Sequence, residues 1–455
     1  MFFRFSGVKR TLPGLAACAF AVFSLLSCSG SGTSGNHPSG LALRAFVSNP
    51  VFPSGLGHTP VLNIVDATQD LLSAFTVSLS SISSSLSDAG MMALSPDKNR
   101  TIVVSPSDGR LAIVDNATES VSNVVTLPGT TQSVLVWTDN KTAFAAVPSA
   151  AVVGGSPGAV VMMDITSASI TATIPIPEVR YVAASPNGDQ ILAFSDNSNL
   201  ISVITPSLVG VGTQMPTQPC SSKQAAVCTV SDPSLDHPIG AIFNSTGTTA
   251  YIISCGPECG GSAAAISVLI FGSSSTPPSF TGQVALIPGG ATTALLQGNT
   301  LYVAGTPVAP GNSCTINNIS PSCGQLTLVN TTTMTVTTSV QISDGIHGPI
   351  QMGANAQLFV GSIDCTNAVS LCLNIVDTSS GSVTQSNVVT NKGLFAGGAG
   401  NVTGIAPIPN RSVVYVCVGG RLRVYDTTTD QLRTIPTFGQ PDVIGEAVDV
   451  KVVDF

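Results

Sequence analysis

A short phrase recurs along this chain at a nearly constant spacing. Each copy is a mostly aliphatic run closed by Asp or Asn and usually Thr, at residues 62–68, 111–118, 161–166, 326–331, 373–378 and 422–427. Asp66, Asp115 and Asp164 lie 49 residues apart, and so do Asp377 and Asp426. Such a run is typical of a strand that ends in a turn. A period near 49 residues predicts a repeated unit of four short strands, the size of one β-propeller blade.

The composition supports an all-β chain. Only 9% of the 455 residues are charged, while glycine and proline contribute 44 and 30 residues. Such a chain forms many turns and few long amphipathic helices. Its hydrophobic content of 43% is ample for a core, so a disordered chain is excluded. We therefore expect one large ring-shaped domain over residues 41–455.

The other strands of each unit can be placed around the Asp-ended phrase, taken as the third strand. In the second unit they fall at residues 91–95, 101–105, 111–115 and 123–127. The first unit, at residues 44–48, 61–66 and 75–78, lacks an inner strand, whereas residues 447–453 form a strand without partners. Pairing them would close the ring and remove the exposed sheet edges. We predict eight blades, with seven as the alternative if residues 209–289 divide differently.

The N-terminus has the pattern of an export signal. Arg4, Lys9 and Arg10 precede an apolar run over residues 12–27, which is too short to span a membrane comfortably. The run ends in Leu-Leu-Ser-Cys at Cys28, which resembles the lipobox of bacterial lipoproteins. That resemblance implies cleavage before Cys28 and lipidation of its thiol, with Ser29 resembling an outer-membrane sorting signal. Residues 28–40 would then form a lipidated Gly/Ser-rich tether.

The charge and the cysteines of the mature chain agree with export. Removing the signal leaves 13 basic and 24 acidic side chains, which argues against nucleic acid as a partner. Eight cysteines fall into close pairs within polar loops, which predicts local disulfides in an oxidising compartment. The four pairs are Cys220 with Cys228, Cys255 with Cys259, Cys314 with Cys323, and Cys365 with Cys372. Cys417 lies in an apolar run, where we expect a buried free thiol.

The repeated phrases include residues 62–68, Ser-Pro-Asn-Gly at 185–188 and Thr-Leu-Tyr-Val-Ala at 300–304. These phrases resemble the YVTN-type β-propeller repeats of bacterial and archaeal surface proteins. The resemblance extends over nearly the whole mature chain. It implies the propeller fold but no particular function, because propellers host many activities.

One face of such a ring would carry the long loops. In this strand order, loops between second and third strands share a face with the links between blades. The longest insertions are of this kind and fall at residues 49–60, 148–158, 255–262, 306–323 and 364–372. Ordered loops on a rigid scaffold commonly form recognition surfaces. The alternative is that these loops have no role and that their disulfides only resist proteolysis.

A metal site is an alternative source of chemistry on that face. The starts of the inner strands place Arg180 and four ligand-type residues, namely His237, His347, Glu178 and Glu446, near the mouth of the central channel. Two imidazoles with one or two carboxylates could hold a divalent metal that activates water. The simpler interpretation is that these side chains cap loops or face solvent. No other cofactor is expected, because the haem-attachment motif Cys-x-x-Cys-His is missing.

Three functions remain open at this stage. The first is an envelope-anchored binding or scaffold module that contacts the membrane through its lipid and recognises a protein or glycan through its disulfide-linked loops. The second is a metal-dependent hydrolase similar to lactonase-type propellers. The third is a structural surface or adhesion protein. Dependence on His237 and His347 would separate the second from the others.

Overall fold

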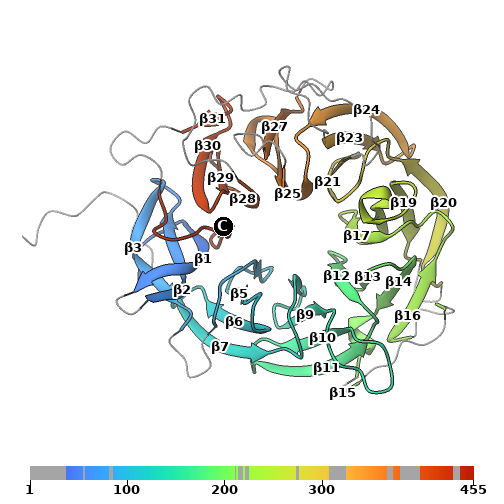
Figure 1. Cartoon of the computed structure of the whole chain (residues 1–455), viewed down its shortest axis with the longest axis horizontal. Helices are drawn as coiled ribbons and strands as arrows, with labels where there is room; N and C mark the ends of the chain where they lie inside the picture. The colour runs from blue at the N-terminus through green and yellow to red at the C-terminus, as the bar shows by residue number, and fades with distance from the viewer. Residues whose placement is uncertain are drawn as a thin grey trace, which may run out of the picture.

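The chain forms a β-propeller of eight blades, as predicted (Figure 1). The computed structural model describes residues 37–54, 57–80, 86–210, 212–213, 219–220, 225–272, 276–306, 324–365, 372–379, 400–433 and 441–455. Within these ranges the sheets follow one another around a central axis, and strands in each blade pair in antiparallel order from the axis outward.

The first four blades contain the N-terminal half of the chain. Blade 1 consists of β32 (Asp449–Val452), β1 (Arg44–Ser54), β2 (Gly57–Asp66) and β3 (Leu71–Ser78). Blade 2 consists of β4 (Met92–Leu94), β5 (Arg100–Val104), β6 (Arg110–Asp115) and β7 (Ser120–Thr126). Blade 3 consists of β8 (Ser133–Val136), β9 (Thr142–Val147), β10 (Ala159–Asp164) and β11 (Ser169–Pro175). Blade 4 consists of β12 (Val179–Ala184), β13 (Ile191–Ser195), β14 (Leu200–Ile204) and β16 (Val227–Ser231).

The remaining blades complete the ring. Blade 5 consists of β17 (Pro238–Phe243), β18 (Thr249–Ser254), β19 (Ala265–Ile270) and β20 (Ser279–Leu286). Blade 6 consists of β21 (Thr293–Gln297), β22 (Thr300–Gly305), β23 (Gly324–Asn330) and β24 (Thr335–Ile342). Blade 7 shows β25 (Ile346–Met352), β26 (Gln357–Ile363) and β27 (Leu373–Asp377), and its expected fourth strand at 383–389 lies outside the described residues. Blade 8 consists of β28 (Val402–Pro407), β29 (Val413–Val418), β30 (Arg421–Asp426) and β31 (Gln431–Leu432).

A few short elements lie outside this pattern. In the described ranges, three 3₁₀ helices lie in loops, namely η2 (Pro206–Leu208), η3 (Gly256–Cys259) and η4 (Ala354–Ala356). The two-residue strand β15 (Gly212–Thr213) adds to the outer edge of blade 3, parallel to β11. No helix among the described residues is long and apolar enough to cross a membrane.

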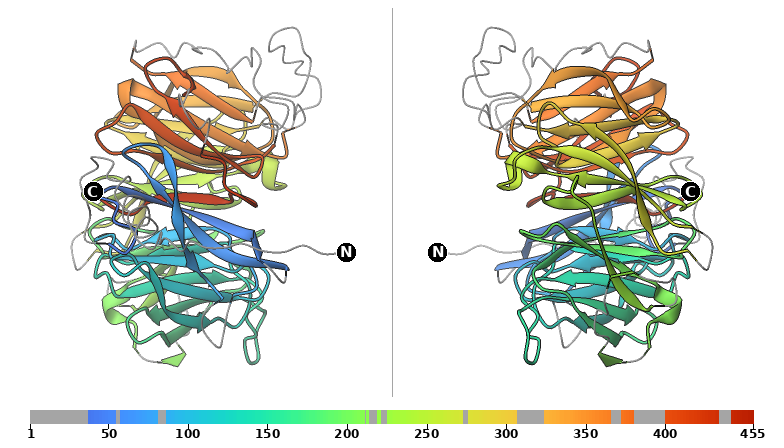
Figure 2. Two further views of the ribbon diagram at one scale, coloured as in Figure 1. Left: turned by 90° about the vertical axis from the view of Figure 1, so that its left-hand side faces the viewer. Right: turned by 90° about the vertical axis from the view of Figure 1, so that its right-hand side faces the viewer.

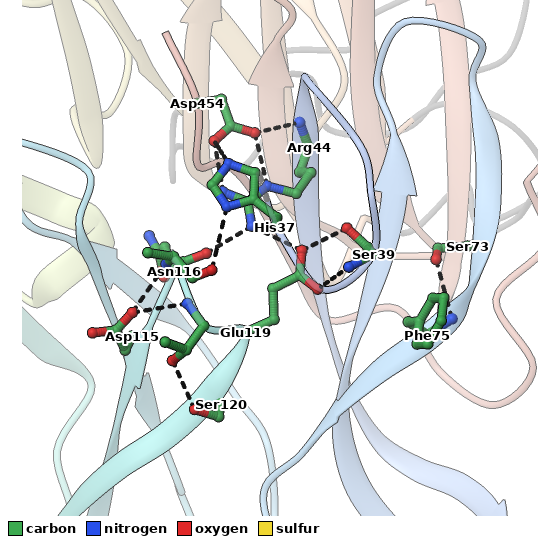
Figure 3. Close-up of polar contacts among 12 residues, drawn as sticks. His37, Ser39, Arg44, Ser73, Phe75, Asp115, Asn116, Glu119, Ser120 and Asp454 are labelled. Atoms are coloured by element: carbon green, nitrogen blue, oxygen red, sulfur yellow. Dashed lines mark hydrogen bonds and ion pairs between the residues drawn. The ribbon is translucent and has the colours of Figure 1, made fainter. Parts of the chain in front are cut away.

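The ring closes within blade 1, as the unpaired strands of the sequence predict. The C-terminal β32 pairs antiparallel with β1, bringing Ala45 opposite Val452 and Ser48 opposite Asp449. A buried ion cluster then joins this blade to blade 2 (Figure 3). Arg44 lies between Asp454 at the C-terminus and Glu119 in the turn after β6. The start of β1 and the residue that follows β32 by two positions are therefore held together and held to blade 2.

The hydrophobic core lies between adjacent blades. The middle strands of the blades are buried on both faces, and every residue of β9 and of β29 is buried. Their sequences are therefore continuous apolar runs. Ile102 and Val104 of blade 2 belong to the same cluster as Ala145 and Val161 of blade 3. Each fully buried Val, Leu or Ile contributes roughly 1.5–3 kcal/mol relative to exposure. The outer strand β20 is mostly exposed, which marks the rim of the ring.

The recurring Asp or Asn is a turn-forming residue, as expected from the sequence. Its side-chain oxygen accepts a hydrogen bond from the backbone N–H two residues later, which closes an Asx turn after the third strand. This bond is 2.7–3.0 Å long at Asp66, Asp115, Asp164, Asn330, Asp377 and Asp426. The repeat therefore reflects local backbone chemistry and is not a row of catalytic carboxylates.

The two faces of the ring differ in what they carry. We call the face with the loops between second and third strands and the links between blades the loop face; it includes residues 196–199, 236–238 and 255–263. The opposite terminus face carries the turns between first and second and between third and fourth strands, together with Glu119 and Asp454. In both side views, the C-terminus and the coil of η3 lie on opposite sides of the ring (Figure 2).

Of the four predicted disulfides, three form among the described residues. Cys255–Cys259 and Cys365–Cys372 lie in loop-face connections, whereas Cys220–Cys228 fastens the connection that leads into β16. Together they indicate an oxidising, exported environment.

The other predicted cysteine roles have different outcomes. The fourth disulfide, between Cys314 and Cys323, is not shown, because Cys314 and Cys323 both lie outside the described residues, so this pairing stays a prediction. The lipidation candidate Cys28 also lies outside them. Cys417 is a buried free thiol, as predicted.

One expected loop is instead mostly strand. The sequence predicts an irregular insertion at residues 49–60, but β1 and β2 extend into a long hairpin with a register shift between Asn49 and Phe52. The bulge lets pairing continue past two prolines, which strands otherwise accommodate poorly.

Candidate functional site

A pocket of about 350 Å³ opens on the loop face between blades 4 and 5. It is lined by Arg180, Tyr181, Ser195, Asp196, Asn197, His237, Pro238, Ile239 and Cys259. These residues come from the start of β12, the end of β13, the start of β17 and the disulfide-linked loop after β18. The volume falls within the range of small-molecule sites. The sequence prediction placed Arg180 and His237 on this face, and the structure brings both into one pocket.

An Arg–Asp pair forms one wall of the pocket. Arg180 Nε lies 2.7 Å and 2.6 Å from the two carboxylate oxygens of Asp196, and its Nη2 also contacts this carboxylate. The hydrogen bonds to Asp196 raise the pKa of Arg180 above its ordinary value. About one-third of each side chain is exposed, at 35% and 33%. The pair therefore fixes the start of β12 to the end of β13 while remaining accessible to a ligand.

His237 forms a second wall of the pocket and pairs with Asp236. The Asp236 carboxylate is 2.9 Å from His237 Nδ1 and accepts hydrogen bonds from Ser262 N at 2.6 Å and Ala263 N at 2.8 Å. Burial opposes ionisation of this carboxyl, but these hydrogen bonds outweigh burial and hold the pKa of Asp236 well below its usual value. Asp236 is therefore a fixed anion whose lone pairs are already engaged.

The Cys255–Cys259 disulfide holds this second wall in place. Cys255 N donates to His237 O at 3.0 Å, and Gly256 N donates to Asp236 O at 3.1 Å. His237 adopts a left-handed φ of 55°, which is uncommon for a residue other than glycine, and Asn199 Oδ1 accepts its backbone N–H at 3.0 Å. The linked loop thus imposes a backbone shape that places the imidazole at the pocket.

Several polar groups at the pocket remain open. Within the described part of the chain, the Ser195 hydroxyl, the Asn197 amide and His237 Nε2 have no hydrogen-bond partner. Tyr181 also lines the pocket, and burial raises the pKa of its phenol, so the hydroxyl stays neutral at physiological pH. The sequence reasoning missed Tyr181, Asp196, Asn197 and Asp236. Each of them lies at the loop-face end of a strand near Arg180 or His237, and this position in the strand order could have identified them.

The other residues considered as metal ligands lie in different surroundings. His347 is buried in blade 7, where its Nε2 is 3.0 Å from Ser343 O and burial lowers its pKa to about 4. Glu446 precedes β32, and its backbone N–H donates to Asn49 Oδ1 at 3.1 Å. Glu178 precedes β12 but does not line the pocket. The described residues contain no group of three or more His, Cys, Asp or Glu side chains that could hold a metal ion, so the metal site stays a prediction.

A partly buried carboxyl group, that of Glu258, lies in η3 of the disulfide-linked loop. Glu258 packs against blade 6 so closely that a side chain at Gly290 would collide with its Oε2, and that oxygen has no hydrogen-bond partner in the described residues. Burial raises the pKa of Glu258 to about 7, which the hydrogen bond from Thr306 N only partly offsets. The loop that shapes the pocket therefore carries a group that titrates near neutral pH.

Comparisons with known proteins show the fold and go no further. No protein-family model matches the chain, and no curated protein matches it. Among solved structures, the dihydro-heme d1 dehydrogenase NirN is 12% identical over 91% of this chain and 75% of its own, with a TM-score of 0.57. A hydrazine synthase from Kuenenia stuttgartiensis is 14% identical over 77% of this chain and 98% of its own, with a TM-score of 0.49. A periplasmic gluconolactonase from Pseudomonas aeruginosa is 14% identical over 90% and 98%, with a TM-score of 0.46. At such identities the shared property is the propeller itself.

Proposed function

We propose that this chain is an exported, lipid-anchored β-propeller of the YVTN-repeat type that works as a binding module of the outer membrane. Its loop face is the recognition surface. The observation that carries this proposal is that the two faces of the ring carry different structural features. The pocket and two disulfide-linked loops lie on one face, and both ends of the ring are held on the other.

The sequence and the disulfides support the proposal of export and anchoring. The basic residues Arg4, Lys9 and Arg10, the apolar run and Cys28 resemble a lipoprotein signal, and disulfides require an oxidising compartment. A Gly/Ser-rich tether of residues 29–40 would have a root-mean-square span of about 20 Å. It enters the ring on the terminus face, where Ser39 donates to Glu119 from both N and Oγ. An anchor at Cys28 would therefore direct the loop face away from the membrane.

A binding role explains the pocket better than a purely structural role does. Arg180, Asp196, Asp236 and His237 are positioned by strands and by a disulfide before any ligand arrives. Pre-organised polar groups around an open concave site favour recognition. The hydrolase alternative has no comparable observation behind it, because no cluster of metal ligands is found in the described part of the chain.

Energy transfer from each face to the membrane tests this arrangement. The full-length lipidated protein would be reconstituted into vesicles that contain an acceptor-labelled lipid. A donor dye would be attached through Val153→Cys on the loop face or Thr332→Cys on the terminus face, both of which are exposed positions. Cys417 is buried and would not take the dye. We expect clearly stronger transfer from position 332 than from position 153.

The unlipidated variant Cys28→Ser supplies the control, since it should give background transfer from both positions. Equal transfer from both faces in the lipidated protein, or stronger transfer from position 153, would contradict the proposed orientation. Failure of wild type to incorporate labelled palmitate at Cys28 would contradict the anchor itself.

A further inference from the structure

We infer that the pocket between blades 4 and 5 binds a neutral saccharide, a ring that carries several hydroxyl groups and no charge. This inference rests on the proposed function, because it assigns a ligand class to the loop face. Three features of the pocket support it. Its charged side chains are paired within the protein, several of its polar groups are available to donate or accept hydrogen bonds, and apolar residues lie beside them.

The charged side chains at the pocket are already paired within the protein: Arg180 and Asp196 line it, and Asp236 is bonded to the lining residue His237. Arg180 is held on Asp196 through Nε and Nη2, so an anionic ligand would have to compete with this carboxylate. Asp236 accepts hydrogen bonds from His237, Ser262 and Ala263, so a cationic ligand would find its oxygens occupied. A charged ligand would thus have to break existing pairs, whereas a neutral ligand leaves them intact.

The groups left open suit hydroxyls. Ser195 Oγ and the Asn197 amide can each donate and accept, and His237 Nε2 accepts when the neutral ring donates from Nδ1 to Asp236. Within the described residues none of these three atoms or groups has a protein partner. Sugar hydroxyls are also both donors and acceptors, so one ring could satisfy several such groups at once. Arg180 Nη1, which lies a long 3.5 Å from Gln132 Oε1, adds a further donor.

An apolar surface lies next to these polar groups. The pocket lining includes Tyr181, whose side chain also packs against the neighbouring core, together with Pro238 and Ile239. The C–H face of a pyranose is apolar and packs against aromatic and aliphatic side chains, while its edge carries the hydroxyls. The pocket therefore combines the two kinds of surface that a sugar ring presents.

Titration of the mature protein with uncharged and charged sugars tests the inference. The probes are glucose, galactose, mannose, N-acetylglucosamine and the β1–4-linked dimer of the last, compared with glucuronate and glucosamine. Binding would be followed by calorimetry or ligand-observed NMR up to about 10 mM sugar, an approximate ceiling for weak sites. We expect at least one neutral sugar to bind, and to bind more tightly than either charged sugar.

Two variants locate the site. Asn197→Gly removes the open amide without strain, because Asn197 already has a φ of 53°, and should weaken binding by about 3- to 10-fold. Asn410→Gly is the matched control, since Asn410 has a φ of 58° and lies in a turn on the terminus face; its affinity should equal that of wild type. Asp196→Asn should free the Arg180 charge and improve glucuronate binding about 10-fold or more.

Each outcome has a definite meaning. Absence of binding by every neutral probe, tighter binding of glucuronate by wild type, or neutral binding that Asn197→Gly leaves unchanged would overturn the inference. The first two results would leave the orientation of the propeller untouched, because energy transfer measures it separately. Thermal unfolding of each variant would confirm that a loss of binding is not a loss of fold.

Discussion

The Arg44 guanidinium and the Asp454 carboxylate are separated by 410 residues in sequence, yet Nη2 and Oδ1 lie 2.7 Å apart. The same guanidinium donates to Asn116 O at 2.6 Å and to Glu119 Oε1 at 2.8 Å, and only 1% of the side chain is exposed. Strand pairing alone would close the ring within blade 1. This cluster also joins the closing blade to blade 2, so both strands that close the ring, β1 and β32, adjoin one buried cation (Figure 3).

Replacing this cation should destabilise the whole ring. In Arg44→Ala, Glu119 and Asp454 would remain partly buried without their partner, which typically costs about 3–5 kcal/mol. Urea unfolding of variant and wild type measures the loss. Lys141→Ala is the control, because its pair with Asp164 is surface-exposed and should contribute less than about 1 kcal/mol. Similar losses in the two variants would show that the cluster does not hold the ring closed.

Glu258 should make stability fall as pH rises. Its folded-state pKa of about 7 lies above the value near 4.5 expected after unfolding, so the folded state retains a proton that the unfolded state releases. The stabilisation is complete below about pH 4.5 and is lost as pH rises through 7. Because the group is partly exposed, we expect a modest effect. Between about pH 5 and pH 8, the free energy of unfolding of wild type should fall by about 1–2 kcal/mol more than that of Glu258→Gln. Parallel pH profiles for the two proteins would refute this assignment.

His347 should act in the opposite direction. Burial lowers its folded-state pKa to about 4, below the ordinary value near 6.5, so the unfolded state takes up a proton first as the pH falls. The stabilisation is present above about pH 6.5 and is lost as pH drops towards 4. Between pH 7 and pH 4, the free energy of unfolding of wild type should fall by up to about 3 kcal/mol more than that of His347→Gln. The imidazole resonance, followed by NMR, should not titrate above pH 5, and titration near 6.5 would contradict burial in the neutral form.

The Cys255–Cys259 disulfide should keep the pocket wall ordered. Removing it in Cys255→Ala/Cys259→Ala releases a short loop whose closure stabilises the folded state by about 2 kcal/mol. Amide hydrogen exchange in residues 255–263 should then accelerate more than about 10-fold. Cys220→Ala/Cys228→Ala is the matched control, because that disulfide lies away from the pocket and its removal should leave exchange in residues 255–263 unchanged. Equal acceleration in both variants would show that the effect is global.

Much of the fold was predictable from the sequence because its signal is local. The Asx turn after each third strand requires Asp or Asn at one place, so the period of those residues locates the blades. The unpartnered strand at residues 447–453 and the incomplete first unit then implied the closure that β32 and β1 form. The single tryptophan, Trp137, joins two blades, because its Nε1 donates to Gly188 O of blade 4 at 2.9 Å.

The site was only partly predictable because its properties depend on contacts between separate segments of the chain. Arg180 and His237 could be placed on the loop face from the strand order. The pairing of Arg180 with Asp196 depends on the register of β12 and β13, which no local pattern specifies. The raised pKa of Glu258 comes from burial of its carboxyl group, which lies against Gly290 in the link that leads into blade 6. The hairpin at residues 49–60 was missed because Pro50, Pro53 and Pro60 are poor strand residues, and the bulge that accommodates them has no signature in the sequence.

Hydrogen exchange of the mature protein, with and without a saturating neutral sugar, tests the central claim that recognition occurs at the loop-face pocket. The account predicts slower exchange in residues 195–199, 236–240 and 255–263 on sugar addition, with no change in the terminus-face turn at residues 115–119. Protection confined to the terminus face, or no protection anywhere, would contradict it.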